Sequence, residues 1–359
     1  HPMPSILHHL HAAAGAEFQP YADIEIVTTF GHPQAEYAAV RTAAAIIDLP
    51  QRGLIELTGK DRLPFLNNLV TNQTKLETNH GVYAFLLNTK GRITTDLNVL
   101  ELGDRTLLEL DRRMAEIVAK TLEKYVFTED VKIQLRLSEM AEIALHGPTA
   151  PKILHEYIAT DVSTMSPLAC VQVNSTILWR DDVLGVPGYH LICPVSELEN
   201  IWQSLLKTFA SPDPVQAAKQ RLRSIGWAVY NTTRIEAGRP FFGIDFDDTV
   251  LPAETGQMNR AVSLTKGCYL GQEIVARMHA RNQVPRKIVG LRISEDALPI
   301  AGTAFPEGLI TSSTVSPVLS NACIALALVK KPFYEIGTKL KVPAEGAMRD
   351  AIVLSLPFH

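Results

Sequence analysis

Hydrophobic positions in the first two thirds of the chain change repeatedly from helical spacing to strict alternation. Helical spacing predicts helices over residues 37–47, 61–68 and 113–125. Alternation predicts strands over residues 53–59, 83–87, 93–102, 107–110 and 131–135, with residues 88–92 as the tip of a hairpin. Strands and helices that follow one another so closely indicate an α+β layer, with helices on one face of an antiparallel sheet.

A second cycle of the same kind follows, and then the last part of the chain changes character. Strands are predicted over residues 141–145, 176–180 and 189–193, and helices over residues 150–158, 196–208, 217–227 and 232–238. Beyond Pro285, short strand-like runs cover residues 288–293, 308–313, 323–329, 339–342 and 351–354. They predict a small barrel or sandwich after a boundary near residues 281–285.

Composition narrows the class of protein. A chain of 359 residues, of which 46% are hydrophobic and 20% charged, is expected to form two or three globular domains. The net charge is −4 and the two signs are interspersed, so nucleic acid is not predicted as a partner. No apolar run approaches the roughly 20 residues that cross a bilayer, so no membrane role is predicted.

Neither the N-terminal histidines nor the cysteines suggest a metal site. His8, His9 and His11 are interpreted as a solvated end, and residues 1–20 as a flexible N-terminus. The four cysteines are far apart and include no Cys-x-x-Cys pair, so no metal ligand set can be assigned. Because the start lacks the pattern of a leader and cysteines are few, the protein is expected to be cytoplasmic, with reduced thiols.

The chemically least ordinary segment covers residues 266–273, Lys-Gly-Cys-Tyr-Leu-Gly-Gln-Glu. A helix is predicted over residues 272–278. Cys268 then lies just before the positive end of this helix and two residues from the Lys266 ammonium group, and both effects favour a thiolate. Alternatively, the segment is a tight turn in which Cys268 is a small buried residue and Lys266 a solvated charge.

Two carboxylates are further candidates. Glu236 lies in residues 234–240, Arg-Ile-Glu-Ala-Gly-Arg-Pro, and can accept from two adjacent N–H donors or pair with a neighbouring arginine on a helix surface. Asp96 lies on the strand that follows the Lys-Gly-Arg turn of residues 90–92. It can orient or activate an amine, or it is an exposed charge at a strand edge.

Taken together, residues 266–273, 234–240 and 90–92 resemble the YgfZ/GcvT-related family, aminomethyltransferase-like proteins that bind folate and support iron–sulfur proteins. The Lys-Gly-Cys segment is the mark of the iron–sulfur branch, whereas aminomethyltransferases share the other two more widely. Residues 311–327 resemble the final barrel of this superfamily. The resemblance therefore covers nearly the whole chain after about residue 21.

The resemblance implies a fold, a cofactor and partners. The fold class would be α+β, a three-domain cloverleaf around a central folate-binding hole, with antiparallel sheets, helices and a C-terminal β-barrel. Residues 21–283 would form two intertwined folate-binding domains, and residues 284–359 the barrel. The cofactor would be tetrahydrofolate or a one-carbon derivative, and the partners reduced folate and iron–sulfur client or assembly proteins.

The resemblance also implies roles for single residues. Contacts with folate are assigned to Arg234, Glu236, Asp96, Tyr269 and Lys266. The function specific to the iron–sulfur branch is assigned to Cys268 and Lys266, and Asp96 is the remaining candidate for catalysis. Glu236 would recognise the pterin, because a carboxylate can accept from its ring N–H and exocyclic amine together.

One departure separates the chain from the glycine-cleavage enzymes, which carry paired aspartates where this chain has Thr95 and Asp96. Aminomethyl transfer from a lipoyl carrier is therefore kept as an alternative to the iron–sulfur role. A folate-binding scaffold or sensor without catalysis is a third hypothesis. Lys90 and Arg92 could meet the anionic glutamate tail of folate, or they are solvated residues of the turn.

Overall fold

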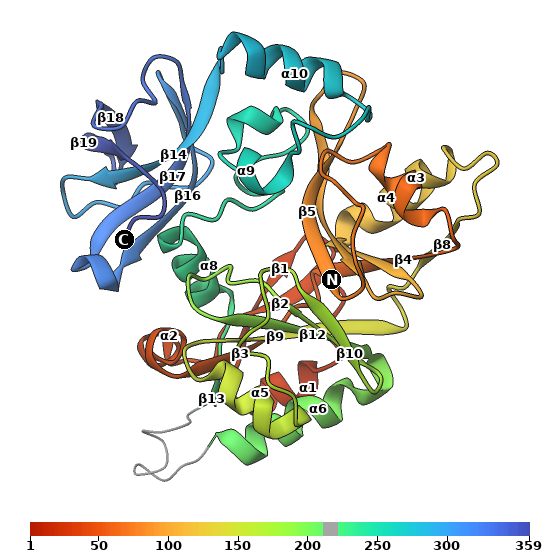
Figure 1. Ribbon diagram of the computed structural model, residues 1–359. Helices are drawn as coiled ribbons and strands as arrows, with labels where there is room; N and C mark the ends of the chain where they lie inside the picture. Colours follow the sequence, from red (N-terminus) through yellow and green to blue (C-terminus); the bar gives the residue numbers. More distant parts are fainter. Residues whose placement is uncertain (211–221) are drawn as a thin grey trace. The chain divides into compact units, whose positions relative to one another are not determined.

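The computed structural model describes residues 1–210 and 222–359, which divide into two compact units (Figure 1). Unit 1 comprises residues 1–65, 74–82 and 97–230; unit 2 comprises residues 66–73, 83–96 and 231–359. Each unit thus combines segments that are far apart in the sequence. The sequence predicted a different division, into residues 1–20, 21–283 and 284–359, and these domain limits stay predictions.

The larger sheet of unit 1 has the strand order β10-β11-β12-β9-β3-β13. Neighbouring strands are antiparallel except β13, which runs parallel to β3. The strands are β3 (Ala44–Asp48), β9 (Met140–His146), β10 (Cys170–Val173), β11 (Thr176–Arg180), β12 (Gly188–Pro194) and β13 (Leu222–Ser224). A separate hairpin consists of β1 (Glu17–Tyr21) and β2 (Ile24–Thr29).

Helices cover one face of this sheet (Figure 1). They are α1 (His8–Ala13), α5 (Ala150–Ile158) and α6 (Val195–Phe209), and α2 (Pro33–Thr42) packs beside β3 and β13. Ile143 and Leu145 of β9 share a core with Leu154 of α5 and Trp202 of α6. Because side chains alternate along a strand, the even-numbered residues of β9 point away from these helices, toward the opposite face of the sheet.

A second sheet has the order β5-β6-β7-β4-β8. Its strands are β4 (Arg52–Thr58), β5 (His80–Leu87), β6 (Ile93–Glu101), β7 (Thr106–Asp111) and β8 (Lys132–Leu135), and the helices α3 (Arg62–Asn67) and α4 (Arg112–Glu123) accompany it. Asp111 caps α4 by accepting from the backbone N–H of Arg113 at 2.9 Å. The hairpin predicted at residues 88–92 is confirmed between β5 and β6.

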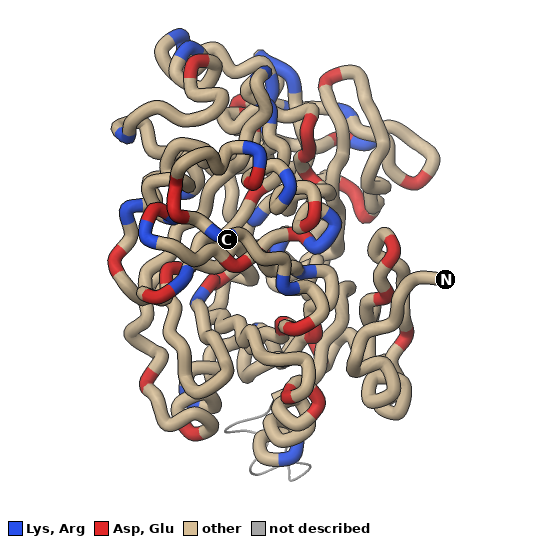
Figure 2. The backbone as a smooth tube through the Cα atoms, turned by 90° about the vertical axis from the view of Figure 1, so that its right-hand side faces the viewer, with Lys and Arg blue, Asp and Glu red and all other residues tan. Residues whose placement is uncertain are grey.

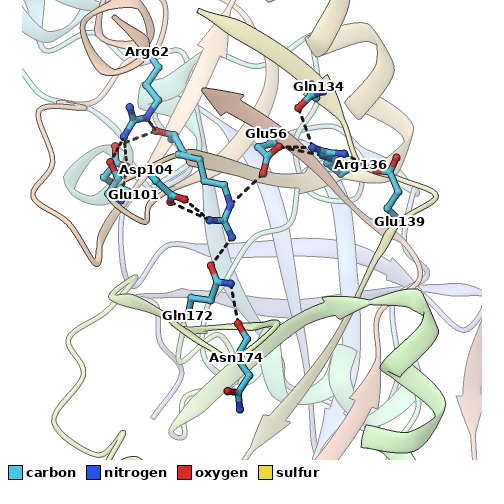
Figure 3. A network of polar contacts seen from close by, with 12 residues as sticks. Glu56, Arg62, Glu101, Asp104, Gln134, Arg136, Glu139, Gln172 and Asn174 are labelled. Carbon is cyan, nitrogen blue, oxygen red and sulfur yellow. Dashed lines mark hydrogen bonds and ion pairs between the residues drawn. The ribbon is translucent and has the colours of Figure 1, made fainter. Parts of the chain in front are cut away.

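Ion pairs in unit 1 join the strands of this sheet (Figure 3). Glu56 of β4 accepts from Arg136 at 2.7 Å and from Arg105 at 3.1 Å, and Arg62 donates to Glu101 at 2.8 Å. Partly exposed pairs contribute only about 0–1 kcal/mol each. These charges are therefore explained by the fold and need no ligand.

Unit 2 contains a six-stranded antiparallel sheet of order β15-β16-β17-β14-β19-β18, which confirms the β-rich end of the chain. Its strands are β14 (Arg286–Ile293), β15 (Ala304–Phe305), β16 (Gly308–Ser316), β17 (Ala322–Lys330), β18 (Lys339–Ala344) and β19 (Ala347–Leu354). Its core includes Leu291, Ala325 and Val353. Short helices complete the unit: α8 (Trp227–Glu236), η1 (Pro252–Glu254), α9 (Met258–Ala261), α10 (Gln272–Arg281) and η2 (Pro317–Leu319). The boundary between the units falls within α8, so only its residues from 231 onward belong to unit 2.

Two helix predictions are wrong in part. The helix predicted over residues 37–47 ends at Thr42, and residues 44–48 form β3, because these apolar residues pair with β9 inside the sheet. Of the helix predicted over residues 217–227, residues 217–221 lie outside the described part of the chain. Residues 222–224 form β13 instead of a helix.

The interpretation of the N-terminal histidines as a solvated end is wrong for His11, whereas His9 is exposed. Leu7 is fully buried, and His11 is 1% exposed. The His11 ring bonds to Asp48 at 2.9 Å and meets Trp202 edge-on. His11 thus lies on the inner side of α1, which packs against the core of unit 1 through Leu7 and Leu10.

Residues of both charge signs are interspersed along residues 1–210 and 222–359 (Figure 2). None of the helices in residues 1–210 and 222–359 is both long and apolar enough to span a membrane.

Candidate functional site

Lys266 of unit 2 is buried, and its ammonium group is fully occupied. Its Nζ donates to the carbonyl oxygens of Asn67 at 2.5 Å, Val70 at 2.7 Å and Asn72 at 2.9 Å. An ammonium group has only three N–H donors. Burial lowers the pKa of Lys266 to about 8. Lys266 therefore anchors residues 66–73 and does not present a reactive amine at the surface.

Cys268, two residues on, is exposed and has a free thiol. A Cβ built on Gly267 would meet no atom within 4 Å, so the face of the loop beside the thiol is open. Gly271, with φ of 82°, turns the chain into α10 at Gln272. The alternative with a buried Cys268 and a solvated Lys266 is therefore wrong, because Lys266 is buried and Cys268 is exposed.

Tyr269 lies on the inner side of this loop. Its ring is 4.9 Å from the Lys266 ammonium nitrogen, a cation–π contact, and its side chain is buried. Burial also raises the pKa of Tyr269 to about 12. The structure gives Tyr269 a contact with Lys266, and its predicted contact with folate stays a prediction.

Asp96 belongs to a second polar arrangement in unit 2. The Tyr83 hydroxyl donates to Asp96 Oδ2 at 2.7 Å, and the Arg260 guanidinium lies 4.2 Å from the centre of the Tyr83 ring. Burial, followed by the charge of Asp96, raises the pKa of Tyr83. The phenol therefore keeps its proton and orients the carboxylate of Asp96.

Residues 66–73 connect these two arrangements within unit 2. The side-chain amide of Asn72 donates to the carbonyl oxygens of Tyr83 at 2.8 Å and of Arg260 at 2.7 Å. The carbonyl oxygen of Asn72 accepts from Lys266. The Lys-Gly-Cys loop and the Asp96–Tyr83 pair, far apart in the sequence, are therefore anchored on one segment.

Arg234 and Glu236 lie on α8 and are completely buried. The Arg234 guanidinium donates to Asn231 at 2.9 Å, to Ser312 at 2.6 Å and to Asp245. Every guanidinium nitrogen is thus bonded, and these bonds tie α8 to Asp245 and to Ser312 of β16.

The Glu236 carboxylate accepts from the Ser316 hydroxyl of β16. This contact brings α8 to the β-sheet of unit 2. Its predicted recognition of the pterin, like the folate contact of Arg234, stays a prediction.

Sequence reasoning missed a buried polar cluster in unit 1. Ligand atoms of Glu109 on β7 and of Glu142 and His190 on the larger sheet lie within 4.8 Å of one another. Arg52 donates to the two oxygens of Glu109 at 2.8 and 2.6 Å. Burial would raise the pKa of Glu109, but Arg52 lowers it, whereas burial and the charge of Glu109 raise the pKa of Glu142.

Burial and the charge of Glu109 thus favour the protonated form of Glu142, and Arg52 favours the ionised form of Glu109. His146, on the same face of β9 as Glu142, is fully buried, and neither of its ring nitrogens has a hydrogen-bond partner among residues 1–210 and 222–359. Burial lowers the pKa of His146 to about 3, so its ring is neutral near pH 7. In the sequence, the cluster is marked only by Glu109 and Glu142, each of which interrupts an apolar strand pattern, Leu-Glu-Leu and Ala-Glu-Ile.

Comparison with known proteins identifies relatives over the whole chain. Residues 7–266 match the GCVT N-terminal domain, and residues 286–359 match the glycine cleavage T-protein C-terminal barrel domain. An aminomethyltransferase of Saccharopolyspora erythraea is 29% identical over 371 residues, covering 100% of this chain and 98% of the relative. An aminomethyltransferase of Geobacillus kaustophilus is 28% identical over 363 residues, covering 98% and 96%.

A solved structure shows the same fold. The glycine cleavage system aminomethyltransferase T from Bartonella henselae matches with a TM-score of 0.89 and 21% identity, covering 100% of this chain and 98% of that one. This confirms the predicted α+β, aminomethyltransferase-like fold class with a C-terminal barrel. Since the family's N-terminal domain alone matches more than half of the residues, the chain belongs to the glycine cleavage T-protein family.

Proposed function

We propose that this protein binds a reduced folate, tetrahydrofolate or a one-carbon derivative, at the Asp96–Tyr83 pair of unit 2 and takes part in one-carbon chemistry there. The observation that carries the proposal is the carboxylate of Asp96, oriented by the Tyr83 hydroxyl at 2.7 Å. A carboxylate held in this way can accept from a folate N–H or take a proton from a nearby amine. Membership of the T-protein family supports the choice of folate.

Calorimetric titration with tetrahydrofolate tests this proposal. Wild type is expected to bind, and Asp96→Asn and Tyr83→Phe to weaken binding by about tenfold, which corresponds to roughly 1.4 kcal/mol. Asp350→Asn, which changes an exposed carboxylate of β19, is the matched control and is expected to bind like wild type. Wild type that is folded but binds no reduced folate would overturn the proposal.

Glu236 is proposed to recognise the pterin through its buried carboxylate. The pterin would have to compete with the bond from Ser316 or find a second site on the same carboxylate. Glu236→Gln replaces one acceptor oxygen by a donor and is expected to weaken tetrahydrofolate binding. Unchanged affinity in this variant would remove Glu236 from the site.

Two finer functions are compatible with folate binding, and the names of the relatives support aminomethyl transfer better than an iron–sulfur role. Aminomethyl transfer predicts turnover of an aminomethylated lipoyl carrier protein to methylenetetrahydrofolate and ammonia. The position of the missing second aspartate is occupied by the buried Thr95, whose hydroxyl donates to the Asp96 carbonyl at 2.9 Å. If Thr95 can replace the second aspartate in catalysis, the wild-type protein turns over the carrier. A folded sample without turnover excludes this function.

The second candidate is an accessory protein for assembly or repair of iron–sulfur clusters. The observation that favours it is the exposed Cys268 thiol on an open loop, a group for which aminomethyl transfer has no use. Iron–sulfur client or assembly proteins would then be its partners, in the cytoplasm. In a deletion strain, wild type is expected to restore iron–sulfur enzyme activity and Cys268→Ser to fail. Equal restoration by both would exclude a role of the thiol.

A further inference from the structure

Asn72 lies where the two polar arrangements of unit 2 meet. Its side-chain nitrogen donates to the carbonyl oxygens of Tyr83 at 2.8 Å and of Arg260 at 2.7 Å, and its side-chain oxygen accepts from the backbone N–H of Gln73 at 2.9 Å. Both N–H donors of the amide are thus used, and all three partners are main-chain atoms. The side chain of Asn72 therefore fixes the backbone of two segments that are far apart in the sequence.

Lys266 fixes the backbone of Asn72 from the side of the Lys-Gly-Cys loop. Its ammonium group donates to the carbonyl oxygen of Asn72 at 2.9 Å and to two other carbonyl oxygens of residues 66–73. On either side of Lys266, the backbone N–H groups of Ser263 and Leu270 donate to carbonyl oxygens of the same segment, at 3.0 and 3.3 Å. The loop is therefore bonded to this segment before, at and after Lys266.

Thr71 ties the same segment to β5. Its backbone N–H donates to the carbonyl oxygen of Phe85 at 3.0 Å, and its hydroxyl accepts from the N–H of Phe85 at 2.9 Å and donates to the carbonyl oxygen of Ala261 at 2.6 Å. Thr71 is fully buried. Thr71 and Asn72 thus hold β5 at Phe85 and at Tyr83, so β5 cannot shift without breaking bonds to the segment.

The residues that Asn72 holds are those whose side chains surround Asp96. The Tyr83 hydroxyl donates to Asp96 at 2.7 Å, and the Arg260 guanidinium lies over the Tyr83 ring at 4.2 Å. All three N–H donors of the Lys266 ammonium are used on residues 66–73. Lys266 can therefore act on Asp96 only through Asn72 and Tyr83.

We propose that Lys266 is a positioning residue of the folate site, and that Asn72 couples this site to the Lys-Gly-Cys loop. The inference rests on the proposed function, because the Asp96–Tyr83 pair is the site that it concerns. With Tyr83 held in advance, tetrahydrofolate does not have to order the site when it binds. Coupling between two sites is reciprocal. A ligand at Asp96 should therefore steady residues 66–73 and, through Lys266, the loop that carries Cys268.

Calorimetric titration with tetrahydrofolate tests the positioning role. Lys266→Met and Asn72→Ala are each expected to weaken binding about tenfold, as the loss of one good hydrogen bond would. The double variant should bind no more weakly than either single variant, because both changes interrupt the same path. Val275→Ala, which removes buried apolar volume from α10, is the control for lost stability alone and is expected to bind like wild type.

Hydrogen exchange with and without tetrahydrofolate tests the coupling, which a merely structural role would not produce. In wild type, saturating ligand should slow exchange in residues 83–96 and also in residues 262–270. In Asn72→Ala, saturated with ligand, the slowing should remain in residues 83–96 and be lost in residues 262–270. If the loop is still slowed in Asn72→Ala, the ligand covers it directly and the coupling is wrong.

Unchanged affinity in both single variants, or losses that add up in the double variant, would overturn the positioning role. If Lys266→Met does not fold, Asn72→Ala alone decides, since it leaves the lysine in place. Wild type that binds tetrahydrofolate while both variants bind it equally well refutes this inference only. Folded wild type that binds no tetrahydrofolate refutes the proposed function and this inference together.

Discussion

The four cysteines show how burial decides the chemistry of single residues. Cys170, Cys193 and Cys323 are buried, and burial raises the pKa of Cys170 and of Cys193 to about 12. Cys268 alone among the cysteines is exposed. Among the four cysteines, Cys268 therefore presents its sulfur to an electrophile or a metal in solution.

Iodoacetamide is therefore expected to label Cys268 selectively at about pH 8. Peptide mass spectrometry should find nearly all of the label on Cys268 in wild type, and almost none anywhere in Cys268→Ser. Comparable labelling of Cys170 in the folded protein would contradict the burial argument. Denatured protein, in which all cysteines react, is the control.

The burial of His146 predicts that the stability of the protein depends on pH. Its pKa is about 3 in the folded protein and roughly 6.5 when unfolded, so between these values the unfolded chain binds more protons. Stability is therefore lost as the pH falls from about 6.5 toward 3, by on the order of a few kcal/mol. His146→Phe should reduce this loss, whereas His155→Phe, at an exposed residue of α5, should not.

Urea unfolding of these proteins at a series of pH values measures the effect. The quantity compared is the change of unfolding free energy with pH, so an overall loss of stability in a variant does not affect the test. The same pH dependence in His146→Phe and wild type would show that His146 does not titrate as a buried group.

At the scale of elements, the Lys-Gly-Cys loop depends on the segment of residues 66–73. The Lys266 ammonium donates to three backbone carbonyl oxygens of that segment, those of Asn67, Val70 and Asn72. A buried acceptor without a donor costs about 1–3 kcal/mol.

Lys266→Met, which keeps the stem and removes the ammonium group, is thus expected to destabilise the protein by about 3 kcal/mol or more. Hydrogen exchange should accelerate in residues 66–73 and 262–270 together. Lys287→Met is the matched control: this ammonium also lies over a tyrosine ring, 4.7 Å from the centre of Tyr334, and its loss should cost less than about 1 kcal/mol. An unchanged exchange rate in Lys266→Met would rule out the anchor.

At the scale of the whole molecule, ligand binding is linked to stability. A ligand that binds only the folded protein stabilises it by about 2.7 kcal/mol when its concentration is 100 times its dissociation constant. Tetrahydrofolate should therefore raise the melting temperature in a concentration-dependent way, and Asp96→Asn should shift this dependence to higher concentrations. A melting temperature that tetrahydrofolate does not change would contradict folate binding.

The sequence alone determined the class of fold and most of its elements. Strand alternation and the turn at residues 88–92 indicated the β5–β6 hairpin, and the short runs after Pro285 indicated the terminal β-sheet, because both follow from local periodicity. The motif of residues 266–273 also singled out the exposed thiol. Local spacing could not show that residues 44–48 are a strand, since their partner β9 lies about a hundred residues away.

The tertiary structure decided what the charged residues do. It buried Lys266 on three carbonyl oxygens and placed Tyr83 beside Asp96. It also put Glu109 next to Glu142 in unit 1, although each glutamate alone looked like an ordinary strand residue. The reason is physical: the protonation and partners of a charged group depend on burial and on neighbours from other segments, and only the folded chain brings these together.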